Sequence, residues 1–221
     1  MRALTPDILE VDLNLDDPAA LAFEAGQWVS VPFGPKNVRA YSIASTPRSA
    51  GRITLCADVA PGGIGSSWFR SLAAGQTVEF KAPFGGFVFR RDDPRRLFFV
   101  AEEIGIVPIR AMLAGLVETG FDRSTTLVYW GRDPAWLPYH AEFLALARRR
   151  PGFAYHPVVA APGACWDGAT GELRAAVDAL APDTRDLVAY VSGGGATIDG
   201  VREVLMARGL DRKSVRWEKF W

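Results

Sequence analysis

Short apolar runs separated by glycine, proline and asparagine fill about the first 93 residues of the chain. The runs have the length of β-strands, and turn-forming residues bound each of them. One segment differs, because Trp68, Phe69 and Leu72 are spaced to bury one face of a short helix at residues 66–72. The predicted strands are residues 8–15, 27–31, 38–44, 52–57, 77–81 and 87–90. Short strands at this close spacing predict a small antiparallel β-barrel.

From residue 97 the chain alternates solid apolar runs with amphipathic stretches. Continuous apolar runs are typical of parallel strands, which need crossover connections and are covered on both faces. The pattern therefore predicts an α/β domain with a parallel sheet between helices. The predicted strands are residues 97–101, 125–130, 153–159, 187–192 and 215–220, and the predicted helices are residues 106–117, 141–148, 171–179 and 198–208.

The segment at residues 90–96 is rich in arginine and aspartate, contains Pro94, and separates the two hydrophobic patterns. Segments of this composition mark domain boundaries. We therefore predict two domains, an antiparallel β-barrel at residues 1–93 and a parallel-sheet α/β domain at residues 94–221. Ligands of open parallel sheets bind outside the carboxyl ends of the strands, so the second domain should carry its site there.

Composition narrows the function classes. The 221 residues carry 25 Lys and Arg against 25 Asp and Glu, so the chain lacks the one-sided basic charge that nucleic-acid binding needs. Two cysteines and two histidines leave little material for a disulfide framework, a four-cysteine zinc site or an iron–sulfur cluster, and we expect no metal site. No apolar run approaches the roughly 20 residues of a spanning helix, and the amino terminus has no signal-peptide core. These features predict a cytoplasmic protein with no membrane span and no nucleic-acid partner.

The first candidate site is the predicted strand at residues 38–44. Strand alternation places Arg39, Tyr41 and Ile43 on one face. An arginine and a tyrosine two residues apart offer a phosphate clamp and an aromatic platform, and Ser42 adds a hydroxyl. The same residues are equally compatible with an ordinary edge strand.

A second candidate lies in the glycine-rich stretch before the predicted short helix. Gly63, Gly65, Ser66 and Ser67 stand where that helix begins. Free amide hydrogens and the positive end of the helix dipole favour a bound phosphate there. A glycine-rich turn with serines also commonly caps a helix without binding a ligand.

Together with the parallel-sheet domain, these motifs resemble the ferredoxin–NADP reductase family of flavoproteins over nearly the whole chain. The turn at residues 83–87 and the aromatic carboxyl terminus also match that family. The resemblance implies a bound FAD, with Arg39 on its pyrophosphate, Tyr41 stacked on its isoalloxazine and Ser42 near its reactive N5 atom. The remaining members of the implied cofactor site are Ile43, Gly63, Gly65, Ser66 and Ser67.

The carboxyl terminus completes the flavin site that the resemblance implies. In the family an aromatic tail covers the open face of the flavin, so Phe220 would take that position and Trp221 would lie just beyond it, against the adenine. Hydride would arrive at flavin N5 near Ser42, Ser192 and Glu218. Phe220 would move aside to admit the nicotinamide.

The expected nicotinamide site departs from the family pattern. The family usually has Gly-Gly-Thr-Gly-Ile-Ala-Pro after the first strand of the second domain. This chain has Glu102 and Glu103 in place of the two glycines, and it keeps Pro108 and Gly105, which would face the nucleotide. A carboxylate that faces a phosphate repels it, so nicotinamide dinucleotides should bind weakly unless the glutamates point away or share a cation. Alternatively, Glu102 or Glu103 caps the helix that follows.

A second departure is Ser192, which replaces the cysteine of the family's Cys-Gly-Pro-Pro motif and should slow hydride transfer more than abolish it. Gly193 follows it and allows a ligand to approach the backbone. Arg132 matches the family position that reads the adenosine ribose. Asp133 and the lack of a basic residue at 160–162 disfavour a 2′-phosphate, so we expect NADH to be preferred to NADPH.

The resemblance thus implies an FAD-dependent oxidoreductase that passes electrons from NADH or NADPH through flavin N5 to a separate ferredoxin, oxygenase component or other acceptor. Glu102, Glu103 and Ser192 motivate an alternative, a flavin-binding relay or regulatory subunit that has lost nicotinamide binding. A third hypothesis, a hydrolase with Ser192 as its nucleophile, lacks the Gly-x-Ser-x-Gly elbow and a histidine placed to activate the serine.

Overall fold

The computed structural model describes residues 1–49, 51–120 and 123–220. The chain divides into two compact units, residues 1–89 with 110–118, and residues 90–109 with 119–221. Two hydrogen bonds tie residues 110–118 to the first unit: Arg110 Nη1 donates to the Ala44 carbonyl (2.9 Å), and Thr46 Oγ1 donates to Glu118 Oε1 (2.8 Å). A domain boundary at residue 93 stays a prediction.

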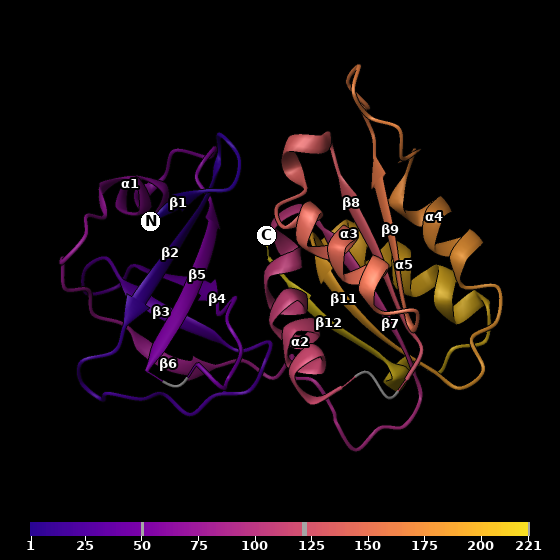
Figure 1. Ribbon diagram of the computed structural model, residues 1–221, viewed down its shortest axis with the longest axis horizontal. Helices are drawn as coiled ribbons and strands as arrows, with labels where there is room; N and C mark the ends of the chain where they lie inside the picture. Colours follow the sequence, from indigo (N-terminus) through magenta and orange to yellow (C-terminus); the bar gives the residue numbers. More distant parts are fainter. Residues whose placement is uncertain (50, 121–122, 221) are drawn as a thin grey trace. The chain divides into compact units, whose positions relative to one another are not determined.

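Two three-stranded antiparallel sheets form the first unit (Figure 1). One sheet has the order β1-β2-β5 and contains β1 (Arg2–Ala3), β2 (Ile8–Asn14) and β5 (Arg52–Asp58). The other has the order β4-β3-β6 and contains β4 (Val38–Ser42), β3 (Trp28–Pro32) and β6 (Lys81–Phe84). An antiparallel bridge between Ile43 and Leu55 links the end of β4 to β5. The predicted antiparallel β architecture is confirmed.

Alternation along β3 builds part of the core of this unit. Val29 and Val31 are buried there, whereas Trp28 and Ser30 between and beside them are only half-buried. Helix α1 (Ile64–Ser71) begins two residues earlier than the sequence predicted and buries Phe69 completely in the same core. The helix thus covers the barrel with the apolar face that its spacing predicted.

The strand predicted at residues 87–90 is wrong. The chain passes directly over Gly26 here, and a Cβ on Gly26 would lie 1.9 Å from the Phe87 carbonyl oxygen. The Phe89 amide donates to the Ala25 carbonyl (3.4 Å) outside any ladder. Because Gly26 has no side chain, the backbone at Phe87 crosses it at close range and does not pair with it as a strand.

The strand predicted at residues 77–81 lies further along the chain. It begins only at Lys81, as β6, and pairs with β3 across an irregularity between Trp28 and Ser30. Phe84 at its end stacks on Trp28, with ring centroids 4.9 Å apart. Because β6 is an edge strand, its proline is tolerated there despite the missing amide hydrogen.

The second unit contains the predicted parallel sheet, which has six strands in the order β10-β9-β8-β7-β11-β12. The strands are β7 (Arg96–Glu102), β8 (Thr125–Gly131), β9 (Phe153–Val159), β10 (Ala169–Thr170), β11 (Leu187–Gly193) and β12 (Val215–Lys219). The helices are α3 (His140–Arg149), α4 (Leu173–Leu180), α5 (Gly195–Ala207) and α2 (Ile106–Thr119), of which residues 110–118 belong to the first unit. The short 3₁₀ turns are η1 (Glu103–Gly105), η2 (Pro134–Trp136) and η3 (Arg212–Ser214). All five long strands and all four helices of the second sequence pattern are confirmed, with ends displaced by at most three residues.

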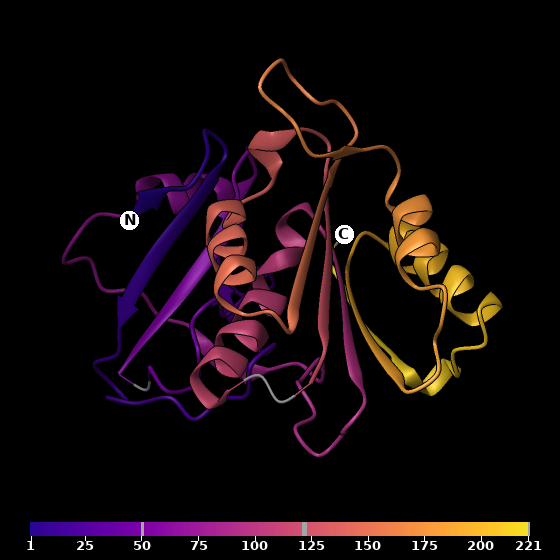
Figure 2. The same cartoon turned by 45° about the vertical axis from the view of Figure 1, so that its right-hand side comes forward.

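Helices cover both faces of this sheet. Helix α3 lies on one face, and α4 and α5 lie on the opposite face (Figure 2). Alternate side chains of β7 point to opposite faces of the sheet. Phe98 and Val100 pack in the core under α4 and α5, whereas Phe99 stacks on Tyr190, with ring centroids 5.3 Å apart. Burial on both faces explains why these strands read as unbroken apolar runs.

The strand order creates a switch point between β7 and β11. The chain moves outward from β7 through β8 and β9 to β10, then returns to place β11 and β12 on the other side of β7. Neighbouring connections therefore diverge at the carboxyl ends of β7 and β11. In open α/β sheets this divergence opens the crevice in which ligands bind.

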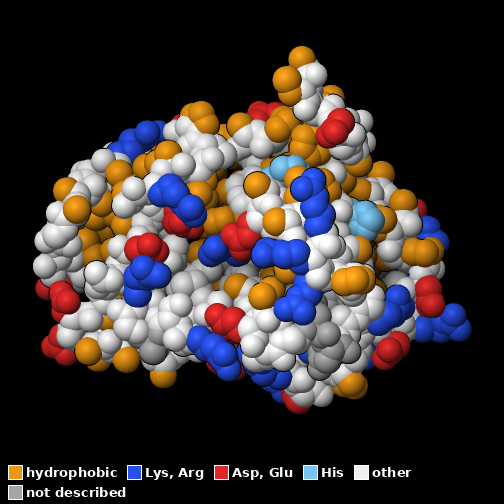
Figure 3. Space-filling view, viewed as in Figure 1, with side chains coloured by type: hydrophobic (Ala, Val, Ile, Leu, Met, Phe, Trp, Pro, Cys, Tyr) orange, Lys and Arg blue, Asp and Glu red, His pale blue; other side chains and the backbone are white. Residues whose placement is uncertain are grey.

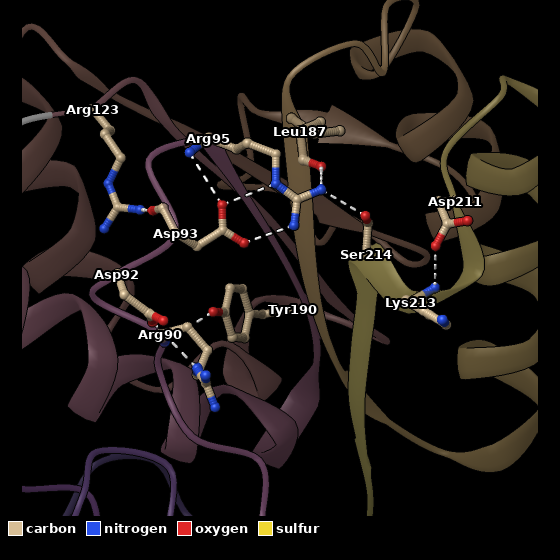
Figure 4. A network of polar contacts seen from close by, with 10 residues as sticks. All are labelled: Arg90, Asp92, Asp93, Arg95, Arg123, Leu187, Tyr190, Asp211, Lys213 and Ser214. Atoms are coloured by element: carbon tan, nitrogen blue, oxygen red, sulfur yellow. Dashed lines mark hydrogen bonds and ion pairs between the residues drawn. The ribbon is translucent and has the colours of Figure 1, made fainter.

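The charged segment predicted as a domain boundary is held to the amino edge of the sheet (Figure 4). Arg95 makes a bidentate ion pair with Asp93, with its Nη2 atom 2.6 Å from Asp93 Oδ2, and also donates to Ser214 Oγ (2.6 Å). The Arg123 guanidinium donates to the Asp93 carbonyl, and the Arg90 amide donates to Tyr190 Oη (3.1 Å). Hydrogen bonds from Arg95 hold the pKa of Asp93 below its usual value. These contacts fix the first residues of the second unit at the edge opposite the crevice.

Candidate functional site

Strand β4 and helix α1 meet at Gly65. A Cβ on Gly65 would lie 2.4 Å from Tyr41 Oη and 3.5 Å from Arg39 Cγ. A larger residue at position 65 would therefore collide with the Tyr41 side chain as it is placed here. The contact brings together Arg39, Tyr41 and the glycine–serine turn, which the sequence singled out as two separate candidates.

The amino terminus of α1 offers uncapped amides. Its N-cap residue, Gly63, makes no side-chain hydrogen bond, and the first turn contains no acidic residue. Ser66 is buried and Ser67 is exposed on this turn. The amide groups and the helix dipole make the turn suitable for an anion.

Arg39 lies beside this turn with an exposed side chain. Its Nη1 atom donates to Asn37 Oδ1 (2.7 Å) and to the Val38 carbonyl (2.9 Å). Both partners are neutral, so the positive charge of the guanidinium is not paired by these two contacts. A guanidinium next to uncapped helix amides is the arrangement that binds a phosphate or pyrophosphate.

Tyr41 is half-buried in an aromatic cluster. Its ring stacks on Trp68, with centroids 5.6 Å apart, and meets Phe69 edge-on at 5.0 Å. Burial raises the pKa of Tyr41 to about 12, although Arg39 opposes the shift. The phenol therefore stays protonated near neutral pH. Stacking of a flavin on Tyr41 stays a prediction and would use the ring face that Trp68 does not cover.

The next two residues lie deeper. Ser42 is buried at the end of β4, where it pairs with Trp28 across the ladder. The Ile43 side chain is completely buried in the core of the unit, and its amide donates to the Gln27 carbonyl (2.9 Å). Any contact of Ile43 with a cofactor would therefore have to use its backbone.

In the second unit, the Glu102 carboxylate lies at the switch point between β7 and β11. Its Oε2 atom accepts a hydrogen bond from the Gly194 amide (2.7 Å), and Gly194 is the N-cap residue of α5. A Cβ on Gly193 would lie 2.8 Å from both Glu102 Cβ and Glu102 Oε2. We expected Glu102 or Glu103 to cap α2, the helix that follows them, and this expectation is wrong. Glu102 caps α5 instead, and α2 has no side-chain cap.

Glu103 is paired with Arg132. Its two carboxylate oxygens accept from Arg132 Nε and Nη2, each at 2.7 Å, which makes a bidentate ion pair. Glu103 is only 6% exposed, and its carbonyl accepts from Tyr129 Oη (3.0 Å). The Arg132 guanidinium also lies 3.9 Å from the centroid of the Trp136 ring. The residue predicted to read a ribose is therefore already engaged by an internal carboxylate.

Gly105 and Ser192 pack directly together. A Cβ on Gly105 would lie 2.5 Å from the Ser192 carbonyl oxygen, so this glycine is required by the contact between η1 and β11. Ser192 is completely buried, and its hydroxyl has no hydrogen-bond partner among the described residues. In the ladder Ser192 is level with Glu218, which is half-buried on β12. The Ser192 hydroxyl bonds to no histidine in the described part of the chain, which argues against the hydrolase hypothesis.

The end of the described chain lies beside the same strand. The Phe220 amide donates to the Gly193 carbonyl (3.0 Å), which extends the pairing of β12 with β11 by one residue. Phe220 is half-buried. The prediction for Trp221 lies outside the described residues.

An open cavity of about 260 Å³ adjoins the Glu102 carboxylate on the α4 and α5 side of the sheet. Its walls include Trp130, Glu172 and Thr197. The Trp130 indole N–H donates to the Gly171 carbonyl (2.9 Å), which fixes the ring. Sequence reasoning missed this cavity and the Gly194 amide. The three consecutive glycines at residues 193–195, where β11 ends and α5 begins, were the available signal.

Surface charge, metal-ligand groups and helix hydropathy add three observations. On the face shown in Figure 3, basic and acidic side chains are interspersed, without a one-sided basic patch. Among residues 1–49, 51–120 and 123–220, no group of three or more His, Cys, Asp or Glu residues could hold a metal ion. No helix within these ranges is long and apolar enough to cross a membrane.

Two family models match the chain. Residues 2–89 match the oxidoreductase FAD-binding domain, and residues 99–203 match the oxidoreductase NAD-binding domain. The first match contains β4 and the α1 turn, and the second contains the crevice between β7 and β11.

Three curated proteins illustrate the similarity. Ferredoxin–NADP reductase B of Sorangium cellulosum is 30% identical over 233 residues, which cover 100% of this chain and 94% of that protein. The phenol hydroxylase P5 protein of Acinetobacter pittii is 31% identical over 100% of this chain and 63% of that protein. Reductase component 1 of the terephthalate 1,2-dioxygenase of Comamonas is 29% identical over 93% of this chain and 61% of that protein. The chain thus spans less than two thirds of the length of two of these relatives.

Solved structures agree in fold. The cytochrome P450 reductase GcoB of Amycolatopsis superposes with a TM-score of 0.89 at 26% identity, over 99% of this chain and 67% of that chain. A ferredoxin NADP+ reductase of Neisseria gonorrhoeae, with bound FAD and NADP, superposes with a TM-score of 0.79 at 18% identity, over 99% of this chain and 94% of that chain.

Proposed function

This chain belongs to the ferredoxin reductase-type family of FAD- and NAD(P)H-dependent oxidoreductases, and we propose that it passes electrons from NADH, in preference to NADPH, through FAD to a separate acceptor protein. The observation that carries the proposal is the meeting of β4 and α1 at Gly65. It joins a guanidinium, a neutral phenol and uncapped helix amides in one place.

The residues of the first unit fit FAD. Arg39 and the amides at the start of α1 would hold the pyrophosphate, since both are available to an anion. Tyr41 would support the isoalloxazine as an uncharged ring, because its pKa is raised to about 12. FAD, when bound, supplies the redox chemistry: it takes up two electrons as a hydride and passes them on singly.

The second unit would bind and orient the donor. Gly105, Ser192 and Gly193 lie together at the carboxyl ends of β7 and β11, where ligands of open parallel sheets bind. The buried Ser192 hydroxyl lacks a partner among the described residues and could bond to the carboxamide. Phe220 and Glu218, at the end of β12, would complete this side of the site.

The acceptor is proposed by analogy with the relatives. Two of them are named as parts of a dioxygenase and a phenol hydroxylase, and another is named a ferredoxin reductase. A separate ferredoxin or oxygenase component is therefore the acceptor that we propose for this chain. The cytoplasmic location that forms part of the proposal is supported by the composition, because two cysteines cannot make the disulfide framework typical of small secreted proteins.

Ferricyanide reduction by the FAD-loaded protein tests this function. We expect turnover with NADH to exceed turnover with NADPH, and we expect it to fall when Arg39 is replaced by alanine, because the pyrophosphate would lose its cation. Bound FAD should be measured on the same samples by its absorbance. Absence of turnover with either nucleotide, in protein that holds FAD, would contradict the proposal.

One observation favours a second candidate, a flavin-binding relay that does not use nicotinamide. The Glu102 carboxylate already bonds to the α5 amide at the switch point, where a nucleotide phosphate would otherwise bind. If the relay is correct, the wild type should not bind NADH measurably. Glu102→Gly should then create binding, because the amide and the crevice become free. A wild-type protein that binds NADH at micromolar concentrations, with no gain in the variant, would exclude the relay.

A further inference from the structure

The strands β7 and β8, with α2 between them, form a βαβ unit with adjacent parallel strands. Units of this type that bind nucleotides read the adenosine ribose at the carboxyl end of the second strand. A carboxylate there accepts from the 2′-hydroxyl, whereas an arginine accommodates a 2′-phosphate. Arg132 directly follows β8 and therefore stands at the reading position.

Arg132 is held there by an anion from the first turn of the same unit. The Glu103 carboxylate engages Nε and Nη2, each at 2.7 Å. These two N–H groups form the fork with which an arginine usually grips a phosphate or a carboxylate. The Arg132 backbone amide also donates to Glu103 Oε1 (3.3 Å). A phosphate at this position would have to displace Glu103 or lie beside its negative charge.

The glutamate is positioned before any ligand arrives. Its side chain is 8% exposed, against 55% for Arg132, so the anion is the fixed partner and the guanidinium is the accessible one. Tyr129 Oη holds the Glu103 carbonyl from β8. Glu103 also has a left-handed backbone, with φ of 46°, which a glutamate adopts only where its surroundings impose it.

The residues that directly follow β8 and β9 offer a phosphate no second cation, and Arg174 lines the cavity on the α4 and α5 side together with Glu102 and Trp130. Among the described residues that directly follow β8 and β9, namely 132–133 and 160–162, Arg132 is the only basic one. Asp133 Oδ1 accepts from the Ala135 amide (2.8 Å). Lys219 lies at the end of β12, which is separated from β8 by two strands, so its strand is roughly 14 Å away.

We propose that Glu103 is the residue that determines the choice of donor, because its ion pair with Arg132 withholds from a 2′-phosphate the cation it would need. The site thereby selects a nucleotide with a free ribose 2′-hydroxyl. Selection of this kind works by penalising the wrong ligand more than by adding contacts to the right one. The proposal rests on the proposed function, in that the donor is a nicotinamide dinucleotide.

Binding of two nucleotide fragments, measured by calorimetry on the FAD-loaded protein, tests the proposal directly. The probes are adenosine 2′,5′-bisphosphate and 5′-AMP, which differ in the 2′-phosphate alone. We expect Glu103→Gly to raise the affinity for the bisphosphate by about tenfold or more and to change the affinity for 5′-AMP by less than about threefold. Glycine suits the left-handed backbone at this position, and Glu103→Gln provides a second variant that keeps the size of the side chain.

Two controls separate this effect from a general change in charge. Glu103→Gly combined with Arg132→Ala should lose the gain, since the released cation is removed. Asp178→Asn breaks another carboxylate–arginine ion pair of the same unit, Asp178 with Arg208 at 2.8 Å, and should leave both affinities unchanged. An unchanged preference in both Glu103 variants, or a gain that persists without Arg132, would overturn the proposal.

The same proteins distinguish this inference from the proposed function. Flavin reduction by NADH in the wild type reports on the function alone. If the wild type is not reduced but the Glu103 variants gain bisphosphate affinity through Arg132, the function is wrong and the charge-based selection stands. If the wild type is reduced by NADH and the fragment preference does not move, the function stands and Glu103 does not set the choice.

Discussion

At the scale of single residues, a few close contacts determine which anion-binding groups of this chain are available to a ligand. Gly65 lets Tyr41 Oη approach to a distance that no side chain would permit. Glu102 and Glu103 place carboxylates on the Gly194 amide and on Arg132. The first unit thus keeps its anion-binding groups available, whereas the second unit has engaged its own with internal anions.

Gly65→Ala should disrupt the first of these contacts. The new Cβ would lie 2.4 Å from Tyr41 Oη, so the Tyr41 side chain or α1 must shift. Overpacking of this kind costs about 1–3 kcal/mol in free energy of unfolding, and we expect FAD affinity to fall as well. Chemical denaturation and FAD titration measure the two effects.

Gly63→Ala is the matched control for stability. A Cβ on Gly63 has no neighbour within 4 Å, and the residue has φ of −75°, which alanine adopts readily. Its free energy of unfolding should change by less than about 0.5 kcal/mol. Equal destabilisation by the two alanines would show that the contact between Gly65 and Tyr41 is not what matters.

At the scale of elements, the sequence predicted the second unit better than the first. The strand predicted at residues 187–192 matches β11 to within one residue, because this strand is buried along its whole length and reads as an almost unbroken apolar run. The strand at 87–90 failed, since its backbone crosses Gly26 instead of pairing. The partner of Glu102 could not be predicted either. Gly194 is 92 residues away, and only the strand order brings the two together.

The contacts of the charged segment before β7 add a structural role that the sequence did not predict. The segment was predicted as a boundary, and the structure holds it by the Asp93–Arg95 ion pair. Because this bond lowers the pKa of Asp93 in the folded state, it stabilises the fold above the unfolded pKa of about 3.9. That contribution is lost as the pH falls through the lower folded pKa.

Asp93→Asn should therefore lower the free energy of unfolding by about 2 kcal/mol near neutral pH, since it removes a charged hydrogen-bond acceptor. The difference from the wild type should be constant between about pH 5 and pH 8 and should shrink below about pH 4. Urea denaturation at a series of pH values measures it. A difference that does not change with acidification would mean that the ion pair contributes nothing through its charge.

At the scale of the whole molecule, the family and both cofactor-binding domains could be predicted from the order of the motifs along the chain. The family models match the same two regions, residues 2–89 and 99–203. The two glutamates in the glycine turn predicted an altered donor site, but the sequence could not show which groups their carboxylates bond to. One caps α5, and the other neutralises Arg132. The chain combines a familiar flavin fold with a donor site that its own carboxylates occupy in part.

The most direct test of the proposed reductase function is the anaerobic absorption spectrum of the FAD-loaded protein, recorded before and after addition of NADH and, separately, of NADPH. We predict that NADH bleaches the flavin bands rapidly and that NADPH does so more slowly. A flavin that stays oxidised with both nucleotides would contradict the proposed function and would favour a relay that receives its electrons from another protein.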